Sequence, residues 1–196
     1  MNGPVFTMQD IPRKVSPYPH KVKPFCELRY EHLGNPTKAE LAKLIEHCRI
    51  EHAAELTIPK GKEVYFVGGK YKQVSAPDVP KGTLPLSLIA LHNHPVDFPP
   101  STDDVAMFLK VPAHKSEFVI LPNGTVYEMF KTKDTPVVKS VETVRQARKE
   151  IWEKNLSTEE GKKWMFSETP AHIQEDVLFK LSQRFKFGIR KGWVKK

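Results

Sequence analysis

The chain has 196 residues and a mass of 22.4 kDa, with 39% hydrophobic and 28% charged residues. This is long enough for one globular domain with an extension, and too short for two full domains. The longest apolar stretches, such as residues 84–91, are far shorter than the roughly 20 residues of a membrane-spanning helix. The first residues lack the cationic start and apolar run of a secretory signal, so we expect a cytoplasmic protein that does not contact membranes.

Basic residues outnumber acidic residues by 31 to 23, and the excess is concentrated in the C-terminal third. Residues 131–196 contain 16 lysines and arginines against 9 acidic residues, a net charge of +7. The two cysteines, Cys26 and Cys48, are too few for a disulfide framework and lack the spacing of a thiolate zinc site.

The sequence of residues 1–75 predicts an arm, a helix and a hairpin. Residues 1–36 contain six of the 17 prolines, which favours an extended surface arm. Apolar residues at helical spacing predict an amphipathic helix over residues 38–50. Residues 51–58 and 63–75 are rich in apolar and β-branched residues on either side of a Pro-Lys-Gly turn, which predicts a β-hairpin.

The sequence of residues 86–185 predicts a buried strand, a second hairpin and several helices. Residues 86–94 form a short apolar run typical of a buried strand, and residues 101–110 have the pattern of a short helix. Residues 117–131 contain two β-rich runs around Pro-Asn-Gly, the clearest hairpin in the chain. Helical patterns follow over residues 137–155 and 171–185.

This order of elements predicts an α/β (α+β) fold in three parts. The parts are a Pro-rich arm over residues 1–36, a core over residues 37–131 and a basic helical extension over residues 132–196. Fold class alone does not identify the function.

The residues best suited to chemistry are His92, His94 and Asp104. Residues two apart on a strand project from the same face, so the two imidazoles lie side by side. Pro95 ends the strand, and a Pro-rich loop returns the chain so that Asp104, in the first turn of the next helix, points at the same place. Two imidazoles and a carboxylate can hold a catalytic zinc and leave one tetrahedral position open for water.

Each part of this pattern also has an ordinary structural interpretation. A bare His-x-His pair is common, and Ser101 with Asp104 matches a capping box that stabilises a helix start. The two roles of Asp104 are compatible, because a first-turn carboxylate can both cap a helix and bind a metal. Asp103 would replace Asp104 as the ligand if the helix register differed by one residue.

The segment LHNHPVDFPPSTDD, residues 91–104, closely resembles the signature of the JAB/MPN/JAMM metalloprotease superfamily. That signature is an upstream glutamate, then His-x-His-Pro, a short loop and Ser-x-x-Asp at a helix start. The local sequence, His-Asn-His-Pro with prolines before the serine, is most similar to that of bacterial and phage members, including RadC-like and phage-associated JAB domains. Six residues separate His94 from Ser101, one fewer than in the usual eukaryotic pattern. The resemblance covers residues 38–131 and implies a cytidine-deaminase-like mixed β-sheet sandwiched by helices.

The resemblance also implies a glutamate on the strand after the first helix. Glu46 falls inside the predicted helix, whereas Glu51 begins the strand that follows it and is our choice for the catalytic acid/base. Glu55, four residues further on the same strand face, is the second choice, and Glu63 begins the next strand.

The function that the resemblance implies is that of a zinc-dependent metallopeptidase or isopeptidase acting on a protein or peptide substrate. His92, His94 and Asp104 would bind Zn²⁺, and Glu51 would pass a proton from the attacking water to the leaving amine. Ser101 would donate a hydrogen bond to the oxyanion. Hydrolysis of a non-peptide bond is a further possibility, because the motif does not specify the electrophile.

The alternative is an inactive JAB-fold binding or scaffold module that acts through its basic C-terminal tail. Residues 180–196 contain seven basic and no acidic residues, interleaved with Phe185, Phe187 and Trp193. Such a composition is able to contact phosphates and stack on bases, so we expect nucleic acid or an acidic partner at residues 187–196.

Overall fold

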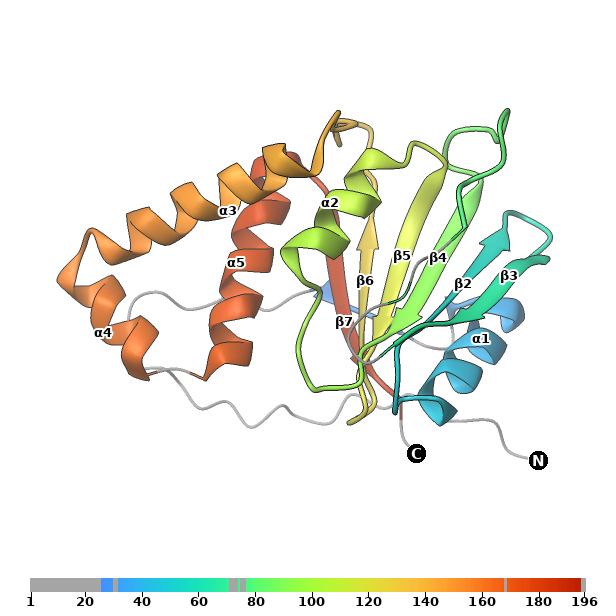
Figure 1. Ribbon diagram of the computed structural model, residues 1–196, viewed down its shortest axis with the longest axis horizontal. Coiled ribbons are helices and arrows are strands. Elements are labelled where there is room, and N and C mark those ends of the chain that lie inside the picture. The colour runs from blue at the N-terminus through green and yellow to red at the C-terminus, as the bar shows by residue number, and fades with distance from the viewer. Residues whose placement is uncertain (1–25, 30–31, 71–73, 75–76, 168, 195–196) are drawn as a thin grey trace.

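The computed structural model describes residues 26–29, 32–70, 74, 77–167 and 169–194, which form one mixed β-sheet with helices on both faces (Figure 1). Its seven strands are β1 (Cys26–Glu27), β2 (His52–Thr57), β3 (Glu63–Gly68), β4 (Leu88–Asn93), β5 (His114–Ile120), β6 (Thr125–Phe130) and β7 (Gly188–Trp193). Its five helices are α1 (Asn35–Glu46), α2 (Thr102–Lys110), α3 (Val141–Leu156), α4 (Glu159–Ser167) and α5 (Pro170–Phe185).

The strands lie in the order β1-β7-β6-β5-β4-β2-β3. Pairing is parallel between β1 and β7 and between β4 and β5, and antiparallel elsewhere. Helix α1 covers one face of the sheet, while α2, α3 and α5 lie on the other (Figure 1). The mixed α/β class expected from the sequence is therefore confirmed.

Strand β4 separates two apolar clusters because its alternate side chains project to opposite faces. Leu91 packs in the cluster beneath α1, together with Leu41 and Leu44 of that helix. His92 projects to the other face, where Phe108 of α2 packs in the second cluster. A buried strand between two apolar layers explains why residues 86–94 form a nearly continuous apolar run.

Most of the local predictions agree with the observed elements. Both predicted hairpins form, as β2 with β3 and as β5 with β6, and the helices predicted around residues 38–50, 101–110, 137–155 and 171–185 are present. Helix α4 was not predicted, because its nine residues lie between the two helical patterns that we identified in the sequence of this region. Most of the predicted arm, residues 1–25 and 30–31, lies outside the described residues.

The β-sheet extends across both predicted boundaries, at residues 36 and 131. Strand β1 comes from the predicted arm and β7 from the predicted extension, yet both lie in the same sheet as the core strands. Strand β7 pairs with β6 on one side and with β1 on the other. The extension therefore completes the sheet of the core.

Residues 187–194 form a half-buried strand and its flanks, which corrects our interpretation of them as an appended tail. Phe187 and Ile189 are buried in the cluster beneath α2, and Val194 is buried in the cluster beneath α1. Arg190 and Lys191 form ion pairs within the fold, with Glu128 and Glu175 respectively. Lys195 and Lys196 lie outside the described residues.

Among the described residues, no helix is both long enough and apolar enough to cross a membrane.

Replacing Phe187 with alanine tests whether residues 187–194 stabilise the core. The ring is 4% exposed and packs edge to face on Phe108, with ring centroids 5.8 Å apart. Phe187→Ala should lower the free energy of unfolding by about 3–5 kcal/mol, the usual cost of emptying a buried aromatic site. Phe166→Ala, at a side chain 86% exposed, should change it by less than about 0.5 kcal/mol. Urea denaturation followed by circular dichroism measures the free energy of unfolding of both variants. Equally small changes in the two would contradict a stabilising role of residues 187–194 in the core.

Candidate metal centre

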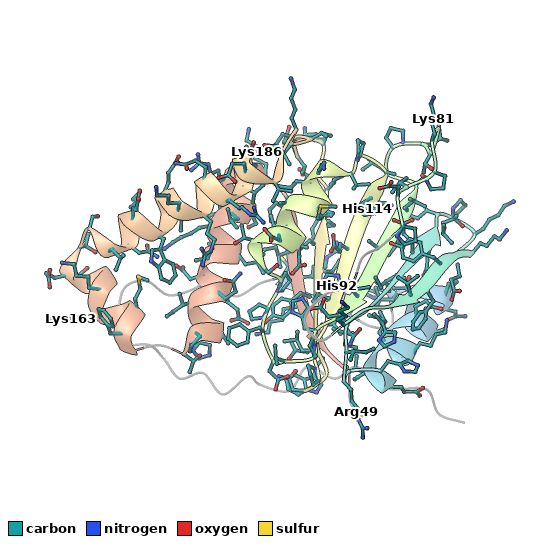
Figure 2. All side chains as sticks on the ribbon, viewed as in Figure 1. Arg49, Lys81, His92, His114, Lys163 and Lys186 are labelled. Atoms are coloured by element: carbon teal, nitrogen blue, oxygen red, sulfur yellow. The ribbon has the colours of Figure 1, made fainter. Side chains whose placement is uncertain are left out.

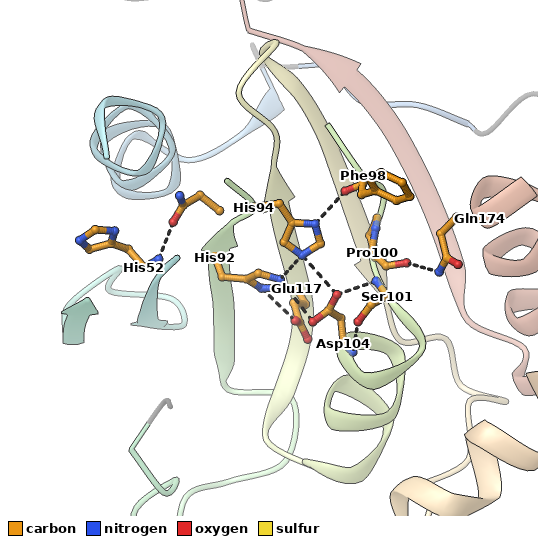
Figure 3. Close-up of polar contacts among 10 residues, drawn as sticks. His52, His92, His94, Phe98, Pro100, Ser101, Asp104, Glu117 and Gln174 are labelled. Atoms are coloured by element: carbon orange, nitrogen blue, oxygen red, sulfur yellow. Dashed lines mark hydrogen bonds and ion pairs between the residues drawn. The ribbon is translucent and has the colours of Figure 1, made fainter. Parts of the chain in front are cut away.

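His92 and His94 lie on the face of the sheet that α2 covers. His92 is in β4, between Ala53 of β2 and Val119 of β5. His94 follows the strand, and its backbone N–H donates to the carbonyl of Ile120 at 2.9 Å, which extends the ladder by one residue. The two residues are 9% and 7% exposed, and their imidazoles lie side by side, as the His-x-His spacing predicts (Figure 3).

The start of α2 brings Asp104 to the same place. Ser101 is the N-cap residue, and its Oγ accepts a hydrogen bond from the backbone N–H of Asp104 at 3.2 Å. In return, Asp104 Oδ2 accepts from the backbone N–H of Ser101 at 2.6 Å. This capping box holds the carboxylate in one orientation, facing the two histidines (Figure 3).

The potential ligand atoms of these three residues, two imidazole nitrogens and the carboxylate oxygens, have the spacing that a small metal ion needs. His92 Nε2 lies 3.2 Å from His94 Nε2 and 3.5 Å from Asp104 Oδ1, and His94 Nε2 lies 3.3 Å from Asp104 Oδ2. Tetrahedral zinc with donors at its usual distances separates them by about 3.4 Å. Among the described residues, these three form the one group of at least three His, Cys, Asp or Glu side chains that could hold a metal.

Both imidazoles are oriented by groups behind them. His94 Nδ1 lies 2.7 Å from the carbonyl oxygen of Phe98, and His92 Nδ1 lies 3.3 Å from Glu117 Oε1. A carbonyl or carboxylate at Nδ1 favours the tautomer with its proton there, so the Nε2 lone pairs face Asp104. Such an arrangement is typical of histidines that bind a metal.

The electrostatics of the group favour a carboxylate beside an imidazolium when no metal is bound. Burial alone would raise the pKa of Asp104, but the charge of His92 and the hydrogen bond from His94 outweigh it and hold the pKa well below its usual value. Burial alone would lower the pKa of His92, but the charges of Asp104 and Glu117 raise it to about 9. A bound metal therefore has to replace a proton at this site.

Glu51 faces the histidines, whereas Glu55 does not. Glu51 directly precedes β2, is half-buried and lines the same cleft as His94 and Asp104. Burial raises the pKa of Glu51; the two histidines lower it and Asp104 raises it, so the pKa lies above its usual value. This suits a group that has to accept and release a proton.

Glu55 lies further along β2 and is 1% exposed, with Oε1 2.7 Å from His114 Nε2. Figure 2 shows His114 and His92 well apart along the sheet. The structure thus separates two carboxylates that the sequence left as alternatives. Glu46 is exposed at the end of α1, and Glu63 pairs with Lys43 on the surface.

Asn93, between the two histidines, is fully buried and fixes the chain around Glu51. Its Nδ2 donates to the carbonyl of Ile50 at 2.9 Å and to that of His47 at 3.5 Å. Its Oδ1 accepts from the backbone N–H of His52 at 2.6 Å (Figure 3). The side chain that alternates away from the ligands therefore ties the strand carrying them to the residues on both sides of Glu51.

Ser101 lies at the wall of the cleft with its hydroxyl proton unused in the cap. The Oγ accepts from Asp104, and a hydroxyl can donate one hydrogen bond in addition. The cleft has a volume of about 900 Å³ and reaches from Glu51 past Ser101 to α3. All five residues predicted from the sequence for this site, namely Glu51, His92, His94, Ser101 and Asp104, are thus brought together.

Four residues that bear on the site were not identified from the sequence. Glu117 contacts His92, and Gln174 of α5 donates to the carbonyl of Pro100 in the loop between β4 and α2. Arg145 and Arg148 of α3 line the outer part of the cleft. None of them has a local signal in the sequence, because each reaches the site through the pairing of strands or the packing of helices that are distant in the chain.

Comparisons with protein-family models, with curated proteins and with solved structures gave no match for this chain.

Substituting adjacent acids of α2 tests the metal centre. Asp104→Asn should abolish binding of about one zinc per chain, because it removes the single carboxylate from the ligand group. Asp103→Asn should retain the zinc, because Asp103 is not one of the three candidate ligands and pairs with Arg145 instead. Elemental analysis after dialysis measures both. Equal zinc contents in the two variants, or no zinc in the unaltered protein after zinc is added, would rule the site out.

The raised pKa of His92 predicts how zinc affinity depends on pH. The pKa of His92 is about 9 in the metal-free site, so at any pH below this value His92 carries a proton that zinc must displace. Affinity should therefore increase with pH, by up to about tenfold per unit for one displaced proton between about pH 6 and pH 8. Competition with a chelator, corrected for the chelator's own protonation, gives the dissociation constant, and a constant that does not change with pH would contradict this electrostatic description.

Proposed function

We propose that the protein is a zinc-dependent metallopeptidase of JAMM type that hydrolyses a peptide or isopeptide bond. The observation that carries the proposal is the convergence of His92, His94 and Asp104, with three ligand atoms within 4.8 Å of one another, beside Glu51 in a cleft. The chemistry of the donor set fits zinc, which accepts imidazole and carboxylate ligands in this number and leaves a position for water.

The architecture supports the same proposal at the level of the fold. A mixed sheet with helices on both faces is compatible with the cytidine-deaminase-like arrangement that the JAMM resemblance implies. The order of the parts also agrees: α1, then Glu51 at the entry to β2, then the histidines at the end of β4, then Asp104 at the start of α2. The six-residue loop after His94 is long enough to form the capping box at Ser101.

In the proposed mechanism, Glu51 is the proton carrier. A zinc ion held by His92, His94 and Asp104 would supply Lewis acidity, polarising the substrate carbonyl and lowering the pKa of water to about 7. Glu51 takes a proton from the water that attacks the carbonyl carbon. It then delivers this proton to the leaving nitrogen as the carbon–nitrogen bond breaks, which regenerates the carboxylate.

Ser101 stabilises the charge that develops on the carbonyl oxygen. Its Oγ is held by the backbone N–H of Asp104, so the hydroxyl is already positioned before substrate binds. Its proton is available to donate to an oxyanion in the cleft. The same residue thereby caps α2 and contributes to the reaction.

A scaffold role through the basic C-terminal segment has less support. Arg190 and Lys191, which we considered as contacts for nucleic acid, form ion pairs with Glu128 and Glu175 inside the fold.

Replacing Glu51 tests the proposed function. Glu51→Gln should lower the rate of hydrolysis by about 100-fold to 10,000-fold, because the amide cannot carry the proton. The variant should still bind zinc, because Glu51 is not among the three ligands. Glu46→Gln is the matched control, since this exposed glutamate of α1 lies outside the cleft and its loss should leave the rate unchanged.

The assay is cleavage of casein and of a panel of fluorescence-quenched peptides by the zinc-loaded protein. Full activity in Glu51→Gln would refute the assignment of Glu51. Absence of cleavage by the unaltered protein across the panel would count against a peptidase.

A further inference from the structure

The cleft extends from the metal ligands to helix α3, which lies outside the motif. Its inner part is formed by Glu51, Ser101 and Asp104, and its outer part by Met107 of α2 with Arg145 and Arg148 of α3. A volume of about 900 Å³ is at the upper end of the range for ligand sites. The outer part is therefore large enough to contact the substrate beyond the scissile bond.

One wall of the cleft, the loop over residues 95–100, is held at three points. The carbonyl of Phe98 lies 2.7 Å from His94 Nδ1, and the carbonyl of Pro100 accepts from Gln174 of α5 at 3.0 Å. Asp97 Oδ1 accepts from the backbone N–H of Asn123 at 3.0 Å. A wall tied to β4, to α5 and to the turn between β5 and β6 is formed before substrate arrives, so its side chains can discriminate between substrates.

The cleft exposes apolar side chains that the fold does not need for its core. Phe98 is 44% exposed and Met107 is 48% exposed, and both line the cleft. Large apolar side chains that gather in a groove rimmed by charges are typical of a binding surface. This part of the cleft suits an apolar side chain of a substrate.

The charge at the outer end of the cleft is positive. Asp103 and Arg145 form a two-pronged ion pair, with Nε to Oδ1 at 3.0 Å and Nη2 to Oδ2 at 2.9 Å, so their charges balance. The guanidinium of Arg148 lies over the ring of Trp152, 5.5 Å from its centroid. Within the described part of the chain, Arg148 has no ion pair with a carboxylate, so its charge is the unbalanced one.

We propose that this cleft selects peptides that carry an acidic residue next to an apolar residue near the scissile bond. The inference rests on the proposed peptidase function and deepens it. Arg145 binds the neighbour of Asp104, and Arg148 lies about one helical turn further along α3. An extended peptide that lies along the cleft can therefore contact both the candidate metal ligands and Arg148, because His94, Asp104 and Arg148 line the same cleft.

The test measures binding separately from turnover. Full-length protein with Glu51→Gln, loaded with zinc, is titrated against fluorescein-labelled octapeptide pools that share a central leucine and carry Glu, Gln or Lys on both sides of it. Fluorescence anisotropy should show the Glu pool binding about tenfold more tightly than the Lys pool. The preference should decrease as salt is added, because Arg148 is exposed to solvent.

Two charge reversals on α3 make a matched pair. Adding Arg148→Glu should abolish or invert the preference. Adding Lys149→Glu should leave it unchanged, because Lys149 is exposed on the same helix but does not line the cleft. With the unaltered zinc-loaded protein, kcat/KM for the Glu pool should exceed that for the Lys pool by about the same factor as in binding.

Any other result overturns either the proposed preference for acidic peptides or the proposed peptidase function. Equal binding of the three pools, or a preference that survives Arg148→Glu, would overturn the inference even if every pool is cleaved. Selective binding of the Glu pool without cleavage of any pool would keep the ligand class and overturn the peptidase proposal. Tighter binding of an eight-residue oligothymidine than of the Glu pool would overturn the inference in favour of nucleic acid.

Discussion

The site depends on one carboxylate that belongs both to the end of a helix and to the ligand group. Asp104 accepts from the backbone N–H of Ser101 and presents its oxygens to His92 and His94. Its rotamer is thus set by the backbone of α2 before any ion binds, so a metal needs to order little besides itself. The capping box stabilises α2 and orients a ligand with the same atoms, and the structural and functional interpretations of the motif are therefore two descriptions of one contact.

A second constraint couples the ligands to the proposed proton carrier. The amide of Asn93 is fully buried, and a buried amide is costly unless its donors and acceptor are satisfied. Its partners are the backbone groups of His47, Ile50 and His52, on both sides of Glu51. The strand that carries the histidines therefore sets the position of Glu51, across more than forty residues of chain.

The sequence revealed the parts of the site whose signals are local. Period-two spacing placed the histidines on one face, and the Ser-x-x-Asp pattern placed Asp104 at a helix start. Glu117 contacts His92 only because β5 pairs with β4 in parallel, a long-range register that local patterns do not encode. Strand β7 was missed for a related reason: its lysine and arginine suggested a tail that binds nucleic acid or an acidic partner, whereas their acidic partners lie on β6 and α5.

The C-terminal third therefore has two roles that its composition alone did not separate. Part of its positive charge is balanced inside the fold, where Arg190 pairs with a buried glutamate of β6 as β7 completes the sheet. Another part faces the cleft, where α3 places Arg148 beyond the metal ligands. The chemistry that we propose for the motif is the same for any amide, so substrate selectivity would have to come from the residues around it. Helix α3 is packed against α2, the helix that carries Asp104 in its first turn, and this contact gives the basic extension a direct physical route to influence substrate selection at the proposed site.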